Sequence, residues 1–228
     1  MQIDRREAIV TALAAGAVLA PVISSAQVAP ATRQYTPKPL PFDPASVPGL
    51  SAKLLTSHHD NNYAGAVKRL GAIQAEFAKI DPTSAPGFVL NGLKREELIA
   101  WNSMILHEVY FAGLGAGVPV APPLAKAIER DFGSHDRWAA EFAGMGKALG
   151  GGSGWVLLTW SDRDQRLTNQ WAADHTMTLA GGTPLLALDM YEHAYAIDYG
   201  AKAPAYVDAY MRAINWKSAN ERFNRLTS

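Results

Sequence analysis

The stretch Pro184-Leu-Leu-Ala-Leu-Asp-Met-Tyr-Glu-His-Ala-Tyr-Ala-Ile-Asp-Tyr199 joins an apolar, strand-like run to side chains that bind metals. The run Leu185 to Leu188 predicts a short buried strand, and Asp189 follows it directly. His193 comes four residues later, where a more helical pattern begins. A carboxylate and an imidazole in this arrangement can converge on a divalent or trivalent metal ion. The competing interpretation is a helix cap at Asp189 and a hydrogen-bonded core histidine at His193.

The composition limits what the protein can be. The 228 residues are 48% hydrophobic and carry 21 acidic and 21 basic side chains. They predict a globular protein of one or two compact domains with a sizeable core. The balanced charge gives no electrostatic footprint for nucleic acid or for an acidic membrane surface. Because the chain has no cysteine, any metal ion must be held by histidine, aspartate or glutamate.

Residues 1–26 predict an export signal peptide. Arg5-Arg6 precede an apolar stretch from Ala8 to Ile23, and Ser24-Ser25-Ala26 offer small residues for cleavage. The paired arginines indicate the twin-arginine route, with a Sec signal or an uncleaved anchor as alternatives. The apolar stretch is too short to predict a stable membrane span. We therefore expect an exported protein, periplasmic or extracellular, whose mature chain begins near Gln27.

The remaining chain divides into a helical part and a mixed part. Residues 27–48 are rich in proline and predict an irregular lead-in. Residues 49–116 predict a hairpin of two long helices, Ser51 to about Ile80 and about Leu93 to Gly113, with a loop from Pro86 to Gly92. Residues 117–228 predict an α/β domain that binds the metal, with strands at 155–160, 166–172 and 185–188.

The predicted fold class is α+β. An N-terminal long helical hairpin is followed by a C-terminal domain with a small three-stranded antiparallel sheet surrounded by helices. Several histidines lie at the inward edges of these elements, and buried titratable groups are costly unless they are paired or bound to a metal. His58, Asn62 and Ala66 share the inward face of the first helix, because they recur at steps of four.

Four motifs carry a resemblance: Ser57-His-His-Asp-Asn-Asn-Tyr-Ala-Gly-Ala-Val67, Asn102-Ser-Met-Ile-Leu-His-Glu-Val-Tyr-Phe111, Gly152-Ser-Gly-Trp155 and Leu188-Asp-Met-Tyr-Glu-His-Ala194. In this order they resemble motifs of the iron/manganese superoxide dismutase family. The resemblance covers about Leu40 to Trp216. The last motif resembles the family signature Asp-x-Trp-Glu-His, with Tyr191 where tryptophan is usual.

The resemblance implies a superoxide dismutase, which converts superoxide to dioxygen and hydrogen peroxide. It implies one iron or manganese ion per chain, with the metal ligands His58, His107, Asp189 and His193. His175 is implied to hydrogen-bond a solvent molecule that serves as the fifth ligand. Glu192 is implied to reach a ligand histidine of a partner subunit, so a homodimer or a dimer of dimers is expected. We expect further residues around the same site: Asn62, Tyr63, Trp155 and Tyr191.

The chain departs from the family pattern around the expected substrate funnel. The family usually has histidine and tyrosine at the positions of Asn62 and Ala66, and a tyrosine at the position of Ala196. Alanine cannot relay a proton, so Tyr63 or Tyr191 are the candidates to replace the lost hydroxyl. The alternative function is therefore a dismutase-fold protein that binds metal with little or no turnover, as a storage or structural dimer.

A helical di-iron carboxylate enzyme is disfavoured, because the chain has no Glu-x-x-His pair. A hydrolase is also disfavoured, because Gly152-Ser-Gly154 lacks the spacing of a nucleophile elbow. Within the resemblance, Ser103 stands where glutamine is typical of many iron members and a small residue is typical of manganese members. His175 occurs with either metal or with enzymes that accept both, and the choice leans slightly toward iron or mixed metal use.

Overall fold

The computed structural model describes residues 33–228, which lie within one compact unit. The expected export signal and the first residues of the lead-in lie outside the described residues. From residue 33 to residue 48 the lead-in is irregular apart from one 3-10 turn, Pro44–Ser46. No helix in the described part is both long and apolar enough to cross a membrane. The predicted division of the chain near residue 116 stays a prediction.

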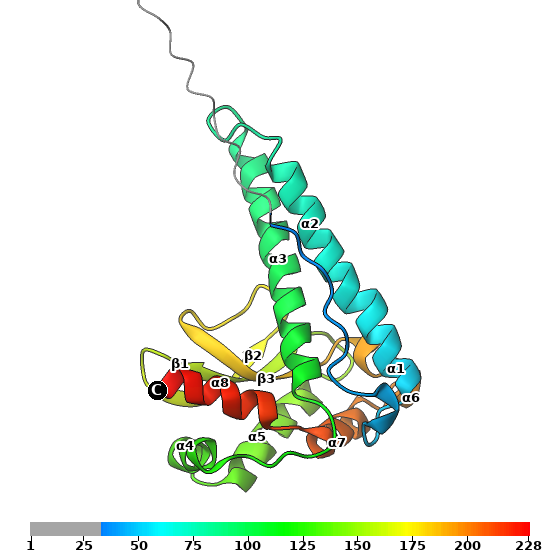
Figure 1. The fold of residues 1–228 in the computed structure, drawn as a ribbon, viewed down its shortest axis with the longest axis vertical. Coiled ribbons are helices and arrows are strands. Elements are labelled where there is room, and N and C mark those ends of the chain that lie inside the picture. The colour runs from blue at the N-terminus through cyan, green and yellow to red at the C-terminus, as the bar shows by residue number, and fades with distance from the viewer. Residues whose placement is uncertain (1–32) are drawn as a thin grey trace, which may run out of the picture. The chain divides into compact units, whose positions relative to one another are not determined.

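Two long helical segments lie side by side as the predicted hairpin (Figure 1). The first consists of α1 (Ala52–Ser57), a π-helical segment (His58–Tyr63) and α2 (Ala64–Phe77). The second is the single long helix α3 (Gly87–Ala112). The hydroxyl of Ser51 accepts the Leu54 N–H at the start of α1, as its sequence position indicated. The π-helical segment was not predicted.

The predicted loop from Pro86 to Gly92 is wrong beyond its first residue, because α3 begins at Gly87. Pro86 stands immediately before the first helical residue, where its missing N–H leaves no hydrogen bond unmade. Its carbonyl accepts the N–H groups of Val89 and Leu90. Glycine lowers helix propensity by about 1 kcal/mol, which is why the sequence indicated a loop. The helix nevertheless runs through both glycines, although Gly87 and Gly92 are exposed.

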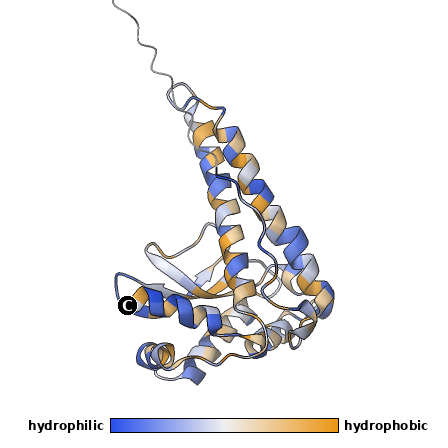
Figure 2. Cartoon of the chain, viewed as in Figure 1, coloured by the Kyte–Doolittle hydropathy of each residue, from blue (hydrophilic) through white to orange (hydrophobic). Residues whose placement is uncertain are grey.

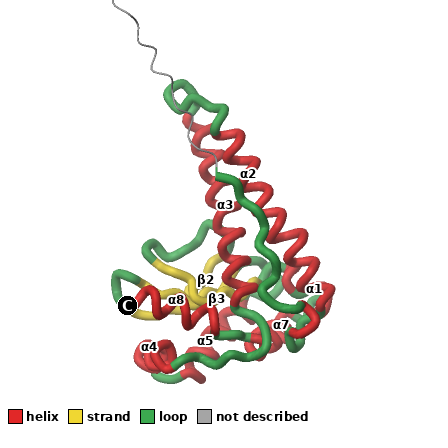
Figure 3. Tube along the Cα trace, viewed as in Figure 1, coloured by secondary structure: helices red, strands yellow, loops and turns green. Residues whose placement is uncertain are grey.

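The predicted three-stranded antiparallel sheet is confirmed, and its strands are drawn in yellow in Figure 3. The strand order is β2-β1-β3. Its strands are β1 (Trp155–Ser161), β2 (Arg166–Ala172) and β3 (Gly182–Asp189). All seven residues of β1, the central strand, are buried. The register between β1 and β3 pairs Trp155 with Asp189, so these two residues stand opposite each other.

Helices surround the sheet, as the fold class predicted. They are α4 (Pro122–Phe132), α5 (His135–Ala148), α6 (Ala196–Tyr199), α7 (Ala203–Ala213) and α8 (Lys217–Thr227), with a 3-10 turn at Glu192–Ala194. Helix α8 was not predicted, because its sequence is polar except for a few residues. Ala219 and Phe223 form its buried side.

One continuous cluster of buried side chains joins the hairpin to the sheet, because α3 packs directly on β3. Hydrophobic and hydrophilic residues alternate along both hairpin helices (Figure 2).

Helix α7 also contacts β3, through two buried hydroxyls. Tyr210 donates to the carbonyl of Ala187 and Tyr206 to that of Asp189, each at 2.8 Å. The carboxyl end of β3 is therefore fixed from both sides.

The backbone conformation immediately before β1 requires a glycine, which is Gly154. Its φ is 133°, and a Cβ at this position would overlap the carbonyl oxygen of Ala172 on the neighbouring strand. We expect Gly154→Ala to lower the free energy of unfolding, measured by urea denaturation, by at least about 2 kcal/mol. Gly71→Ala is the matched control, because Gly71 lies in α2 and an added Cβ there contacts nothing. Equal denaturation midpoints for the two variants would contradict this account.

Candidate metal centre

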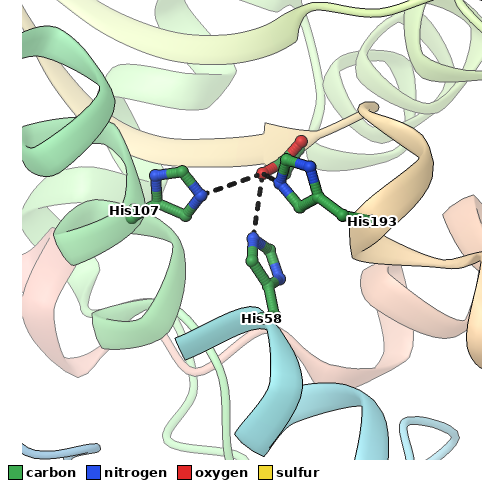
Figure 4. Close-up of side chains that lie close together, drawn as sticks. His58, His107 and His193 are labelled. Atoms are coloured by element: carbon green, nitrogen blue, oxygen red, sulfur yellow. Dashed lines mark hydrogen bonds and ion pairs between the residues drawn. The ribbon is translucent and has the colours of Figure 1, made fainter. Parts of the chain in front are cut away.

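The structure brings four of the predicted site residues together, from four different segments of the chain (Figure 4). Each offers one ligand atom, and these atoms all lie within 4.8 Å of one another: His58, His107, Asp189 and His193. His58 begins the π-helical segment, His107 lies in α3, Asp189 ends β3 and His193 lies in the following 3-10 turn. The first three are buried, and the side chain of His193 is 27% exposed.

The spacing of these atoms fits a single small metal ion. The Oδ2 atom of Asp189 lies 3.1 Å from His58 Nε2, 3.3 Å from His193 Nε2 and 3.6 Å from His107 Nε2. Ligand bonds of about 2.1 Å separate two ligand atoms by about 3.0 Å at right angles and about 3.6 Å at a trigonal angle. In addition, the buried Nε2 of His107 has no hydrogen-bond partner among the described residues. A bound metal ion would satisfy it.

The charge state of the cluster also suits a metal. Burial lowers the pKa of His107 to about 3, and burial likewise lowers the pKa of His58. Burial alone would raise the pKa of Asp189, but its hydrogen-bond contacts with His193 and His58 outweigh burial and hold that pKa well below its ordinary value. Neutral imidazoles and an ionised carboxylate are the forms that bind metal ions. Iron and manganese accept this mixture of nitrogen and oxygen donors.

Neighbouring groups hold these side chains in position. His107 Nδ1–H donates to the Ser103 carbonyl at 2.6 Å, which leaves the Nε2 lone pair directed at the cluster. The Oδ1 atom of Asp189 accepts the Tyr191 N–H at 2.9 Å, so Oδ2 is the oxygen that faces the histidines. Sequence reasoning missed the orienting roles of Ser103 and Tyr206. Ser103 stands four residues before His107, and that spacing could have indicated its role.

His175, Trp155 and Tyr191 border the cluster, on the side of the sheet. Trp155 Nε1–H donates to His175 Nδ1 at 3.0 Å, and Asn102 donates to the His175 carbonyl at 2.6 Å. A neutral imidazole that accepts at Nδ1 carries its proton on Nε2. The Tyr191 ring stacks on His175 and on His193, with ring centres 4.9 Å and 5.5 Å away. Burial raises the pKa of Tyr191 to about 12, so this phenol keeps its proton.

A pocket of about 280 Å³ opens between α2 and α3 where the side chain of Ala66 ends. Its lining also includes Asn62, Arg69, Ser103 and His175. The small side chain of Ala66 therefore leaves a hollow that reaches a residue bordering the metal ligands. Asn62 lies in this hollow, as expected from the inward face of the first helix.

Tyr63 does not offer its hydroxyl to this hollow. The hydroxyl accepts the Lys38 N–H at 2.9 Å and donates to Glu108 at 3.1 Å. Both partners line a different pocket from the one at Ala66. Its one proton is therefore directed at Glu108 and not at the hollow, so this geometry gives no support to Tyr63 as the replacement for the lost hydroxyl. Of the two tyrosines considered, Tyr191 is the one beside His175 and His193.

Glu192 lies on the surface next to the partly exposed His193. It makes no ion pair within residues 33–228. His59 faces away from the cluster, and its Nε2–H donates to the Lys38 carbonyl at 2.8 Å. His135 is exposed at the start of α5, outside the cluster.

We expect His107→Ala to lower the metal affinity of the protein by at least about a hundredfold, because it removes a buried ligand atom. Metal content after dialysis against a chelator, measured by elemental analysis, reports this loss. His135→Ala is the control and should keep its metal, since His135 is an exposed histidine outside the cluster. Full metal content in His107→Ala would exclude His107 as a ligand.

The proteins that this chain resembles are consistent with a metal site at the four clustered residues. The family model for iron/manganese superoxide dismutases, C-terminal domain, matches residues 120–222. An iron superoxide dismutase of Cupriavidus metallidurans is 67% identical over 189 residues, which cover 83% of this chain and 96% of the relative. A manganese superoxide dismutase of Halobacterium salinarum is 32% identical, over 84% of this chain and 96% of the relative. An iron superoxide dismutase of Aquifex pyrophilus is 34% identical, over 80% and 88%. The chain therefore belongs to the iron/manganese superoxide dismutase family.

Proposed function

We propose that this protein is a superoxide dismutase that uses one iron or manganese ion per chain. The observation that carries the proposal is the buried carboxylate of Asp189, with three imidazole nitrogens 3.1 to 3.6 Å from one of its oxygens. Both iron and manganese enzymes stand among the relatives. Membership of the family agrees with this donor set.

Bound iron or manganese supplies the redox chemistry: one superoxide gives up an electron and leaves as dioxygen, and a second gains an electron and two protons and leaves as hydrogen peroxide. Zinc has no accessible redox step and could not support it. The chain supplies the charge balance, because Asp189 contributes one negative charge and the three imidazoles contribute none. It also excludes water, since aromatic rings of Tyr110, Phe111 and Trp155 pack around His58 and His107.

His175 is the group that we assign to proton handling beside the metal. Its Nδ1 accepts from Trp155, so its Nε2 carries a proton and can donate to a solvent ligand. The hollow at Ala66 leads to His175 and has room for several water molecules of about 30 Å³ each. Water held there by Asn62 and Ser103 would take the place of a tyrosine hydroxyl in proton delivery.

Substitutions of His175 test this assignment. We expect His175→Leu to lower kcat for superoxide about ten- to a hundredfold with the metal content unchanged, because the donor is lost and the ligands are kept. His175→Gln retains an N–H donor of similar reach, so it should keep most of the activity. The dismutation rate and metal content of both variants are measured together. Equal rates in His175→Leu and the unmodified protein would remove His175 from the mechanism.

We further propose a dimer in which Glu192 approaches the ligand His193 of a second copy. The support is its exposed position beside the partly exposed His193, together with the exposed side chain of Ile197, one helical turn after His193. Glu192→Ala should shift the sedimentation coefficient from dimer to monomer and reduce metal retention. Glu221→Ala, an exposed glutamate on α8, is the control. A dimeric Glu192→Ala variant with unchanged metal would refute this role.

Export is the remaining proposal. It rests on the arginine pair and apolar stretch of residues 1–26, and on the absence of cysteine, which makes the fold independent of the redox state of its compartment. N-terminal sequencing of the protein recovered from the periplasm or the medium should give a start near Gln27. A protein found only in the cytoplasm with Met1 intact would contradict it.

The proposed activity is tested on purified protein by measuring metal content and superoxide dismutation in the same sample. About one iron or manganese per chain with rapid dismutation supports the enzyme. A full complement of metal with negligible dismutation would favour the alternative function, metal binding without turnover. The cause would then be sought in Ala66, which cannot relay a proton.

A further inference from the structure

A second pocket lies on the other side of Phe111 from the metal ligands, where the lead-in crosses α3 and α8. Its volume is about 180 Å³. Apolar side chains form much of its wall: Pro39, Leu40, Pro41, Phe111 and Ala112. The polar side chains that line it are Lys38, His59, Tyr63, Glu108 and Arg222. Neither the proposed dismutation nor the metal site uses this pocket.

The wall formed by the lead-in is fixed in place at Lys38. The Lys38 N–H donates to the Tyr63 hydroxyl at 2.9 Å, and the Lys38 carbonyl accepts from His59 Nε2 at 2.8 Å. The ammonium group of Lys38 pairs with Glu108 at 2.5 Å. Because one residue of an otherwise irregular segment makes three such contacts, the pocket is formed before any ligand arrives.

Arg222 is the unexplained group in this pocket. Its guanidinium is partly buried, yet no carboxylate of residues 33–228 lies within 4.0 Å of it. Within the described residues its one hydrogen bond is long, from Nη1 to the Pro184 carbonyl at 3.4 Å. Burial lowers the pKa of Arg222, and repulsion from Arg225 adds to this. A partly buried charge without a close partner is unfavourable, and an anion in the pocket would relieve the cost.

The charges around the pocket favour a monoanion. Glu108 attracts Arg222 from a distance, but its carboxylate is already occupied by the Lys38 ammonium and the Tyr63 hydroxyl. Lys38 and Glu108 cancel each other, which leaves the positive charge of Arg222 in excess. A guanidinium binds a carboxylate through two parallel hydrogen bonds, more specifically than it binds a spherical anion.

The size of the pocket limits the rest of the ligand. A cavity of about 150 Å³ in a protein core holds one benzene molecule. The pocket at Arg222, at about 180 Å³, is slightly larger and also has apolar walls. It therefore fits one small ring or a short branched chain that carries a single acidic group.

We propose that this pocket binds a small organic monocarboxylate, whose carboxylate pairs with Arg222 and whose apolar part packs against Pro39, Pro41 and Phe111. The inference does not depend on the dismutase activity. A ligand in this place would touch the ring of Phe111, which packs on the ligand residue His58 with ring centres 5.1 Å apart.

Benzoate is the probe, titrated into the metal-loaded protein by isothermal calorimetry. We expect saturable binding of one benzoate per chain, weakened about ten- to a hundredfold by Arg222→Gln, because a charge-assisted hydrogen-bond pair is lost. Arg225→Gln is the matched control: it removes an exposed arginine from the same helix that does not line the pocket, and it should change benzoate affinity far less than Arg222→Gln does. Ala112→Leu fills the pocket without changing a charge and should also abolish binding, which keeps the test valid if Arg222→Gln folds poorly.

Neutral and inorganic probes separate the contribution of the ligand's charge from that of its apolar part. Benzamide should bind much more weakly than benzoate because it lacks the charge, and sulfate should do so because it lacks the apolar part. Azide, which is directed at metal ions, should not displace benzoate. The proposal is overturned if benzoate does not saturate, if Arg222→Gln and Ala112→Leu both bind it normally, or if azide displaces it. Sulfate binding as tightly as benzoate would reduce the pocket to a simple anion site and would also overturn it.

Discussion

The rest of the structure depends on one buried carboxylate, that of Asp189, facing three imidazole nitrogens at the end of β3. A buried charge in protein is costly unless it is paired or bound to a metal. Asp189 is contacted by the Tyr191 N–H and by three histidines, and burial lowers the pKa of two of these, His58 and His107. This arrangement is unfavourable by itself and becomes favourable when a cation occupies the centre. The four clustered side chains therefore form a metal site and not an ordinary hydrogen-bonded polar cluster.

The two parts of the fold each supply half of the ligands. His58 and His107 come from the helical hairpin, whereas Asp189 and His193 come from β3 and the turn after it. Packing of α3 on β3 is what brings the halves together. Metal binding must therefore be linked to folding, because neither part alone presents more than two ligand atoms. The same packing places Trp155 opposite Asp189, so the residue that orients His175 is set by strand register.

Much of this could be predicted from the sequence, because hydrophobic periodicity and motif spacing are local signals. The hairpin and the sheet followed from them, whereas the ligand set of His58, His107, Asp189 and His193 was implied by the resemblance to the family. Features set by tertiary contacts could not be predicted. The start of α3 at Gly87 goes against the low helix propensity of glycine. The hydroxyl of Tyr63 is taken by Lys38 and Glu108, residues distant in sequence. Helix α8 has too few apolar residues for a clear pattern.

X-ray absorption at the metal edge of the purified protein tests the central claim most directly. It identifies the metal and the atoms bound to it without relying on activity. The account predicts iron or manganese bound by nitrogen and oxygen atoms at about 2.1 Å, with the multiple-scattering signature of histidine rings. This spectrum should be lost in Asp189→Ala. A metal coordinated by oxygen alone, or one whose spectrum is unchanged in Asp189→Ala, would show that the ion is bound elsewhere and would contradict the account.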